Sequence, residues 1–214
     1  MPEGGKIVSW DDTESASSGQ FMDIEHGHNQ ARILSQNPYE VWVHWHKNPE
    51  GKTIRFLCPG SGCPLCSSNE SPSRRFAVVV LNRKTRKVEI LEQGPMVFGQ
   101  IKNKKKITGY EDPRRYDIVI TKSGKGTMHD TDYDVTPTPP SPLTPEEIDF
   151  IKQNYIKIET AYKLPSLDEV KQLIGLAPTV PVAPISKPVV SVGTTPTSSP
   201  DSADLDKFFS ELGG

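Results

Sequence analysis

Apolar positions in the first two thirds of the chain predict a set of short β-strands. The strongest is 76–81, an unbroken run of Phe, Ala, Val and Leu that predicts a strand buried on both faces. Residues 88–91 are placed to pair with it across a turn at 82–87. β-Branched and aromatic residues favour strands at the other positions. These further predicted strands are 20–23, 31–34, 41–45, 52–57 and 116–121.

Helical spacing appears at three later places. A short helix is predicted at 94–101, with Pro95 in its first turn. Thr144 and Glu147 form a capping-box pattern that opens a helix to about residue 162, and Ser166 caps another at 167–173. Short, closely spaced strands with one small helix are typical of a compact barrel. We therefore expect a mainly β fold with added helices, built on an OB-fold-like barrel.

Changes in composition divide the chain into segments. Residues 1–19 are acidic and rich in Ser and Gly, which indicates a disordered leader, and 20–136 hold the predicted barrel. Four prolines between 137 and 142 end the barrel and begin a helical extension, 137–176. Residues 177–200 have the Pro, Ser and Thr content of a linker.

The last segment, 201–214, predicts a disordered acidic tail that folds into a groove of a partner protein. Acidic and apolar residues alternate in it at helical spacing, as in peptides that bind this way. The predicted partner-binding residues are Asp204, Leu205, Asp206, Phe208, Phe209 and Leu212. The alternative is an exposed terminal helix without a partner.

All three cysteines lie in one short stretch, 44–66, with a histidine at its start. Cys63 and Cys66 have the spacing with which two thiolates hold one metal ion in a tight turn, and Cys58 supplies a third sulfur. His44 and His46 lie 14 and 12 residues before Cys58 and would share one face of a strand, so alternation does not choose between them. Three thiolates and one imidazole predict a structural zinc site, an inserted zinc knuckle. Disulfides are the weaker interpretation, because three cysteines cannot all pair and no signal peptide opens the chain.

Charge is segregated along the chain. Residues 40–130 hold 17 Lys and Arg against 9 Asp and Glu, a net of +8, whereas the rest holds 8 against 18, a net of −10. A basic centre predicts a polyanion-binding core, although exposed lysines are often only a solvated face. Aromatic residues within it are candidates for base stacking, with core packing as the alternative for Phe76. The candidate nucleic-acid-binding residues are Trp45, Arg55, Arg74, Arg75, Phe76, Lys102, Lys104, Lys105, Lys106, Tyr110, Arg114, Arg115 and Tyr116.

Other classes of protein have less support. No apolar run is long enough to span a bilayer, so no membrane partner is expected. A cytidine-deaminase site requires proline before its Cys-x-x-Cys pair, and here Pro64 follows Cys63. Glu111, Asp112 and Asp117 are the local carboxylates a metal-dependent nuclease would need, but their positions suggest turn and strand-edge residues. We therefore expect no enzyme activity.

Taken in order, several of these motifs resemble the zinc-containing single-stranded DNA-binding proteins of tailed bacteriophages. The resemblance covers roughly 21–176 and the extreme C-terminus. The segments that carry it are 31–34, His44, 52–58, 63–66, 77–81, 97–101, 112–120, 166–170, 204–206 and Leu212.

The resemblance implies a sequence-non-specific single-stranded DNA-binding protein of DNA replication, recombination and repair, in the cytoplasm of an infected bacterium. It also implies that His44 is the fourth zinc ligand and that the tail recruits replication or recombination proteins. Because 1–19 are acidic, the cooperative binding that a basic N-terminus gives in this family is not expected. The alternative function is a zinc-stabilised RNA-binding or transcription-associated module.

Overall fold

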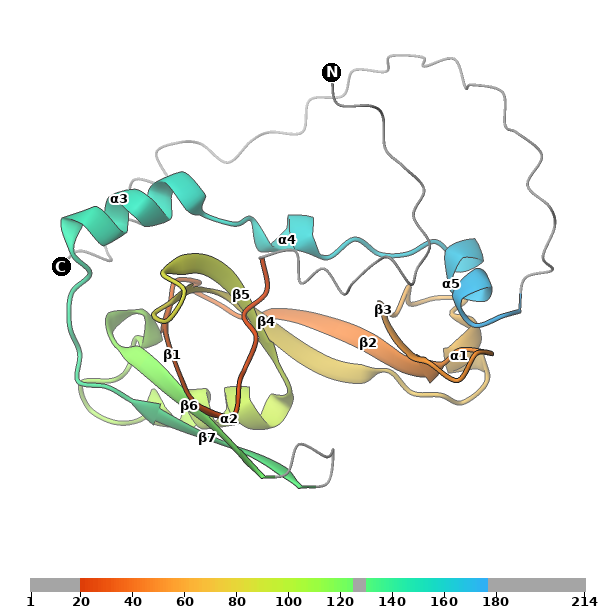
Figure 1. The fold of residues 1–214 in the computed structure, drawn as a ribbon, viewed down its shortest axis with the longest axis horizontal. Coiled ribbons are helices and arrows are strands. Elements are labelled where there is room, and N and C mark those ends of the chain that lie inside the picture. Colours follow the sequence, from red (N-terminus) through yellow and green to blue (C-terminus); the bar gives the residue numbers. More distant parts are fainter. Residues whose placement is uncertain (1–19, 125–129, 177–214) are drawn as a thin grey trace, which may run out of the picture. The chain divides into compact units, whose positions relative to one another are not determined.

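The protein is mainly β, with several short helices (Figure 1). The computed structural model describes residues 20–124 and 130–176. The strands in this part of the chain are β1 Gly27–Ile33, β2 Tyr39–Lys47, β3 Thr53–Leu57, β4 Ser73–Asn82, β5 Lys87–Gln93, β6 Asp117–Gly124 and β7 Thr131–Pro137. The helices are α1 Pro64–Ser67, α2 Pro95–Lys104, the 3-10 turn η1 Pro113–Arg115, α3 Pro145–Asn154, α4 Ile158–Ala161 and α5 Leu167–Leu173.

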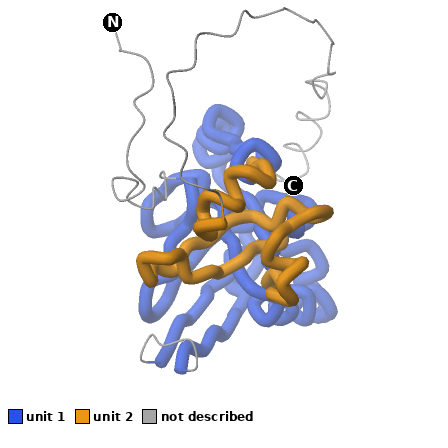
Figure 2. Tube along the Cα trace, turned by 90° about the vertical axis from the view of Figure 1, so that its right-hand side faces the viewer, with its two compact units in different colours: residues 1–41, 74–162 blue, residues 42–73, 163–214 orange. Residues whose placement is uncertain are grey.

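The described residues fall into two compact units, each discontinuous in sequence (Figure 2). Unit 1 contains 20–41, 74–124 and 130–162, and unit 2 contains 42–73 and 163–176. The boundary thus falls inside β2 and at the start of β4. This division differs from the continuous segments 20–136 and 137–176 predicted above, because the chain leaves unit 2 after Ser73 and returns to it at Lys163.

Unit 1 is a curled, half-barrel antiparallel sheet over an apolar core. β4 pairs with β5 on one side and with β1 on the other, β1 pairs with β6, and β6 pairs with β7. β4 is buried continuously from Ala77 to Asn82, as its unbroken apolar run predicted. Val97 and Ile101 of α2 pack into the same core as the buried residues of β4, β6 and β7.

Buried charges in unit 1 connect its strands. The Arg32 side chain is buried and donates to Asp117 Oδ1 at 2.6 Å, while Arg83 pairs with Asp117 and with Glu147 of α3. Arg32 also donates to Ser141, so the segment before α3 is bonded to β1. Several bonds to one carboxylate offset the cost of removing these charges from water.

The structure differs from the predicted elements at three places. Residues 20–23 form only an isolated bridge, Phe21 to Ile90, and β1 begins at Gly27 instead of residue 31. β7 was not predicted, because its sequence Thr-Asp-Tyr-Asp-Val-Thr-Pro is mostly polar. The helix predicted to reach 162 ends at Asn154, since Tyr155 is extended at φ −63° and ψ 131°, and α4 follows separately.

Some predictions fall on residues outside the described ranges. These are the leader 1–19, the linker 177–200 and the tail 201–214 with its six partner-binding residues. Across 20–124 and 130–176, every helix is too short or too polar to cross a bilayer.

Candidate metal centre and nucleic-acid-binding residues

The β2–β3 hairpin places His44 against the core of unit 2. His44 lies opposite Phe56 and His46 opposite Ile54, so these four share one face of the hairpin. The His44 ring is only 3% exposed and lies 5.5 Å from the Phe56 ring, centroid to centroid. The strand register therefore fixes the imidazole inside the unit.

The chain after β3 turns sharply and brings the three cysteines back to His44. Cys58 is held to the hairpin by its amide, which donates to the Trp42 carbonyl at 2.8 Å. Gly60 and Gly62 have φ of +82° and +80°, which L-residues with side chains rarely adopt. Cys63 then precedes α1, where Pro64 occupies a first-turn position that needs no amide donor, and Cys66 lies in α1.

The four predicted ligands, His44, Cys58, Cys63 and Cys66, come together in the His/Cys3 cluster. Their ligand atoms all lie within 4.8 Å of one another. His44 Nε2 is 3.4 Å from Cys63 Sγ and 3.5 Å from Cys66 Sγ, and Cys58 Sγ is 3.6 Å from Cys66 Sγ. Metal bonds of about 2.3 Å to sulfur and 2.1 Å to nitrogen would separate tetrahedral ligand atoms by roughly 3.5–3.8 Å. The cluster therefore fits a single tetrahedral ion.

The structure also decides between the two histidines. His46 is not part of the cluster, and its Nδ1 lies 3.2 Å from Glu70 Oε2. Alternation alone put both on one face, but only His44 lies beside Cys63 and Cys66.

The pKa shifts in the cluster favour metal binding by the His44 imidazole and oppose formation of a thiolate at Cys66 without a metal ion. Burial lowers the pKa of His44, so the ring is neutral and can donate its lone pair. Desolvation raises the pKa of Cys66 to about 12, and hydrogen bonds and negative charge from Cys58 and Cys63 act in the same direction. A bound cation would therefore displace the proton from the Cys66 thiol.

Helix α5 completes the core around the cluster. Val170 and Ile174 pack against Phe56, Cys63 and Leu65. Ser166 and Glu169 form a capping box that fixes the start of α5. The sequence predicted this helix and its cap but assigned it to a separate extension. Val170 and Ile174, four residues apart, indicated an apolar face but not the surface that it covers.

The other face of the hairpin carries predicted nucleic-acid-binding residues. Trp45 is 50% exposed and pairs in register with the exposed Arg55. Trp42, which is on the His44 side of β2 by alternation, is 46% exposed and was not predicted as a stacking residue, although aromatic residues on exposed strands are a usual signal for one. The exposed Trp45 indole beside a guanidinium group is suited to stacking with nucleobases.

The paired arginines and Phe76 lie at the start of β4 in unit 1. The Arg74 guanidinium lies 4.7 Å from the centre of the Phe76 ring and donates to Glu40 Oε2 at 2.6 Å. Phe76 also packs on Phe98, at 5.5 Å between centroids, and is half-buried. Part of the Phe76 ring packs and part remains accessible, and its role in base stacking stays a prediction.

The prediction that Tyr116 is exposed is wrong. Tyr116 is 0% exposed, and its hydroxyl donates to the Tyr110 carbonyl at 3.2 Å. Its polar sequence neighbours suggested solvent, but Tyr116 lies between η1 and β6 and packs in the core of unit 1. Tyr110 is half-buried and packs edge-on against the Tyr116 ring at 5.0 Å. Tyr116 is therefore a core residue and is withdrawn as a stacking candidate.

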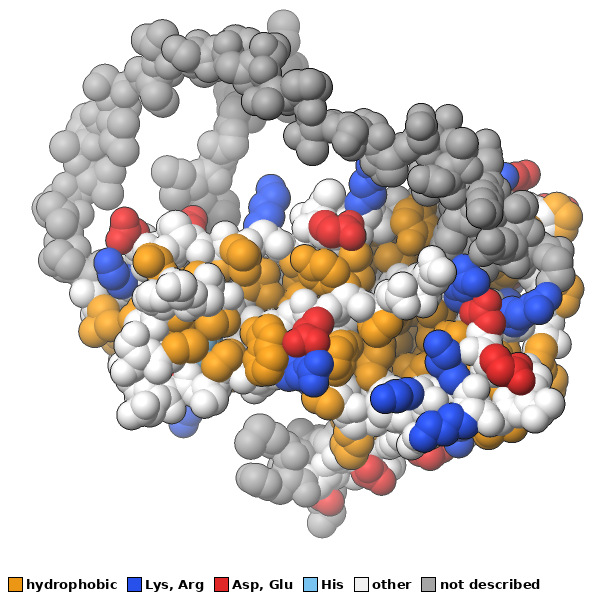
Figure 3. All heavy atoms as spheres, turned by 180° about the vertical axis from the view of Figure 1, so that it is seen from behind, with side chains coloured by type: hydrophobic (Ala, Val, Ile, Leu, Met, Phe, Trp, Pro, Cys, Tyr) orange, Lys and Arg blue, Asp and Glu red, His pale blue; other side chains and the backbone are white. Residues whose placement is uncertain are grey.

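Basic residues accumulate around the end of α2 and around η1. Lys102, Lys105, Lys106 and Arg115 are exposed, Lys104 is partly exposed, and Arg114 is bonded to Asp112. Figure 3 shows basic side chains lying beside apolar ones on the face in view. A surface of this kind suits a ligand that carries charge and also exposes apolar groups.

The carboxylates of the nuclease alternative have other partners. Asp117 is bonded to Arg32 and Arg83, and Asp112 to Arg114. Over the described ranges, the His/Cys3 cluster is the single group of histidines, cysteines and carboxylates arranged to hold a metal ion.

Comparisons with known proteins leave the family open. A scan against protein-family models and searches of curated proteins and of solved structures found no match.

Proposed function

We propose that this protein binds single-stranded DNA without sequence preference and that a structural zinc ion stabilises its binding surface. The observation that carries the proposal is the two-sided hairpin of β2 and β3. One face supplies His44 to the His/Cys3 cluster, and the other presents Trp45 beside Arg55. A single strand exposes both base faces and phosphates, which an indole and a guanidinium group bind together.

Zinc is the metal that this set of ligands favours. Thiolates are soft ligands, and three of them with one imidazole are typical of structural zinc sites. His44, Cys58, Cys63 and Cys66 would hold the ion, which links the hairpin to α1. Four protein ligands leave no position for a reactive water, so a structural role is favoured.

Unit 1 supports the same function through its basic side chains and its curled sheet. Arg74 beside Phe76 and the lysines at the end of α2 are suited to contact phosphates. The curled antiparallel sheet of unit 1 is compatible with an OB-like barrel. With the resemblance to phage proteins, we propose a role in phage DNA replication, recombination and repair. The tail at 201–214 would recruit partner proteins.

The test is a titration of zinc-loaded protein with fluorescent oligo-dT, its duplex form and the matched RNA, at several salt concentrations. We expect tight, salt-sensitive binding to the DNA single strand and weak binding to duplex. Trp45→Ala should weaken binding about 5- to 150-fold, because stacking contributes about 1–3 kcal/mol per base.

Tyr116→Phe is the control, since this ring is buried and only its hydroxyl is removed. Equal affinity for single strand and duplex would exclude the proposal. Tighter binding to RNA than to DNA would replace it with the RNA-binding alternative.

A further inference from the structure

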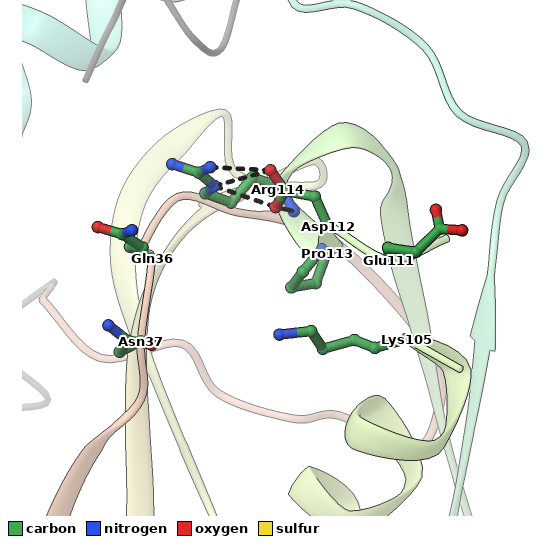
Figure 4. Close-up of a pocket in the computed structure, with 7 residues that line it drawn as sticks. All are labelled: Gln36, Asn37, Lys105, Glu111, Asp112, Pro113 and Arg114. Atoms are coloured by element: carbon green, nitrogen blue, oxygen red, sulfur yellow. Dashed lines mark hydrogen bonds and ion pairs between the residues drawn. The ribbon is translucent and has the colours of Figure 1, made fainter. Parts of the chain in front are cut away.

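A polar pocket lies in unit 1 where three loops meet (Figure 4). It has a volume of about 220 Å³. The pocket is lined by residues of three segments: the β1–β2 loop, the end of α2 and the loop that contains η1. These residues are Gln36, Asn37, Lys105, Glu111, Asp112, Pro113 and Arg114. Figure 4 shows the Lys105 side chain extending into the pocket, with Asn37 on the opposite side.

The walls of this pocket are fixed by bonds to the sheet. The Leu34 amide donates to the Val79 carbonyl at 2.8 Å, and the Val79 amide donates to Ser35 Oγ at 2.8 Å. These bonds hold the loop immediately before Gln36 and Asn37. On the other side Pro113 is buried, and Asp112 caps η1 by accepting the Arg114 amide. A site held on both sides loses little entropy when a ligand binds.

Both carboxylates of the pocket already have partners on their own loop. The Arg114 guanidinium donates to both oxygens of Asp112, at 2.8–3.2 Å. Glu111 accepts the Gly109 amide at 3.0 and 3.1 Å and points away from the other labelled residues. Asp112 is paired with Arg114 and Glu111 is directed away, so the charge that points into the pocket is the Lys105 ammonium. This arrangement favours an anion over a divalent cation.

We propose that this pocket binds a phosphate group of a nucleic-acid strand through the Lys105 ammonium and the side-chain amide of Asn37. An ammonium supplies charge, and an amide N–H₂ supplies a directed donor. The inference rests on the proposed function and deepens it, because it gives the strand a fixed phosphate site. A strand-end phosphate and an internal phosphodiester have the same chemistry here.

The experiment uses the full-length, zinc-loaded protein and oligo-dT with either a 5′-hydroxyl or a 5′-phosphate. Lys105→Ala is compared with Lys87→Ala, an exposed lysine at the start of β5 that does not line the pocket and is not among the candidate nucleic-acid-binding residues. We expect Lys105→Ala to weaken binding about fivefold and to reduce the slope of log K against log salt by about 0.7, the value for one phosphate on a single strand. Asn37→Ala should weaken binding without changing this slope, because it removes no charge.

The outcomes separate the two hypotheses. If the wild-type protein binds oligo-dT but the two lysine variants behave alike, the phosphate site is wrong and the proposed function stands. If the wild-type protein binds no oligonucleotide, the proposed function and the phosphate site both fail. An effect of Lys105→Ala only with a 5′-phosphate places a strand end in the pocket, and an effect with both oligonucleotides places an internal phosphodiester there.

Discussion

At the scale of single residues, His44 and His46 show how two equivalent sequence positions acquire different roles. Both lie on the same face of β2, yet His44 is buried beside two cysteines and His46 lies beside Glu70 at the surface. The imidazole of His44 thus replaces hydrogen bonds to water with contacts to sulfur. A buried ring without such contacts would be costly, which makes His44 the residue on which metal binding depends.

We predict that His44→Ala removes stable metal binding and that His46→Ala does not. Loss of one of four ligands opens the site to water and typically lowers zinc affinity strongly. Metal content per protein after dialysis, measured by atomic emission with both variants in parallel, checks the prediction. Equal metal loss in the two variants would contradict the assignment of His44.

Much of the metal centre could be predicted from the sequence, because ligand type and spacing are local properties. Cys63 and Cys66 bracket one turn, and two glycines allow the chain from Cys58 to reach it. The buried position of Tyr116 could not be predicted in this way. Its local neighbours are polar, and its environment comes from Tyr110 and the core of unit 1.

At the scale of elements, the turn between Cys58 and α1 determines how the metal ligands meet. Gly62 combines a φ of +80° with a close neighbour, since a Cβ there would lie 3.2 Å from Leu167 Cδ1 of α5. Strain at this position would therefore act on both the turn and the helix that covers it.

We predict that Gly62→Ala lowers the free energy of unfolding by about 1–2 kcal/mol, the cost of a left-handed conformation for a residue with a Cβ. Gly99→Ala is the matched control. Gly99 lies within α2, where a Cβ meets nothing within 4 Å, so alanine should stabilise the helix by about 0.5–1 kcal/mol. Denaturant unfolding of both metal-loaded variants tests the pair, and effects of the same sign would contradict it.

The elements themselves were predictable where their patterns were strong. The apolar run of β4 and the capping boxes of α3 and α5 have local causes, and α3 and α5 begin at their predicted caps, although α3 ends at Asn154 and not near residue 162. β7 was missed because its sequence is mostly polar, and Val135 is the one fully buried residue in it. This strand is held by its ladder with β6, a long-range contact that no local pattern reveals.

At the scale of the whole molecule, the chain leaves unit 2 and later returns to it, so residues far apart in sequence stabilise each unit. In unit 1 the buried Arg32–Asp117–Arg83 group does this by connecting β1, β6 and the turn after β4. Burial raises the pKa of Asp117, but the hydrogen bond from Arg83 and the charges of Arg32 and Arg83 outweigh it. The pKa therefore lies below its ordinary value.

A carboxyl whose pKa is lowered by folding stabilises the protein above its unfolded pKa, about 3.9 for Asp. That stabilisation is lost as pH falls through the folded pKa. We predict that Asp117→Asn lowers the free energy of unfolding by about 3–5 kcal/mol at pH 7, because it leaves the buried Arg32 without a carboxylate and removes one of the two carboxylates that pair with Arg83. Below about pH 4 the difference between the variant and the wild type should begin to narrow, and it should close as pH falls through the folded pKa of Asp117.

Metal loss in acid also destabilises the protein, but it affects both proteins equally and cancels in their difference. Asp132→Asn, an exposed carboxylate on β7, is the control and should follow the wild-type curve. Denaturant unfolding between pH 7 and pH 3 provides the measurement. A constant difference between Asp117→Asn and wild type over this range would mean that packing around the side chain, and not its charge, stabilises unit 1. Convergence would show that a single carboxylate connects three distant segments through its charge.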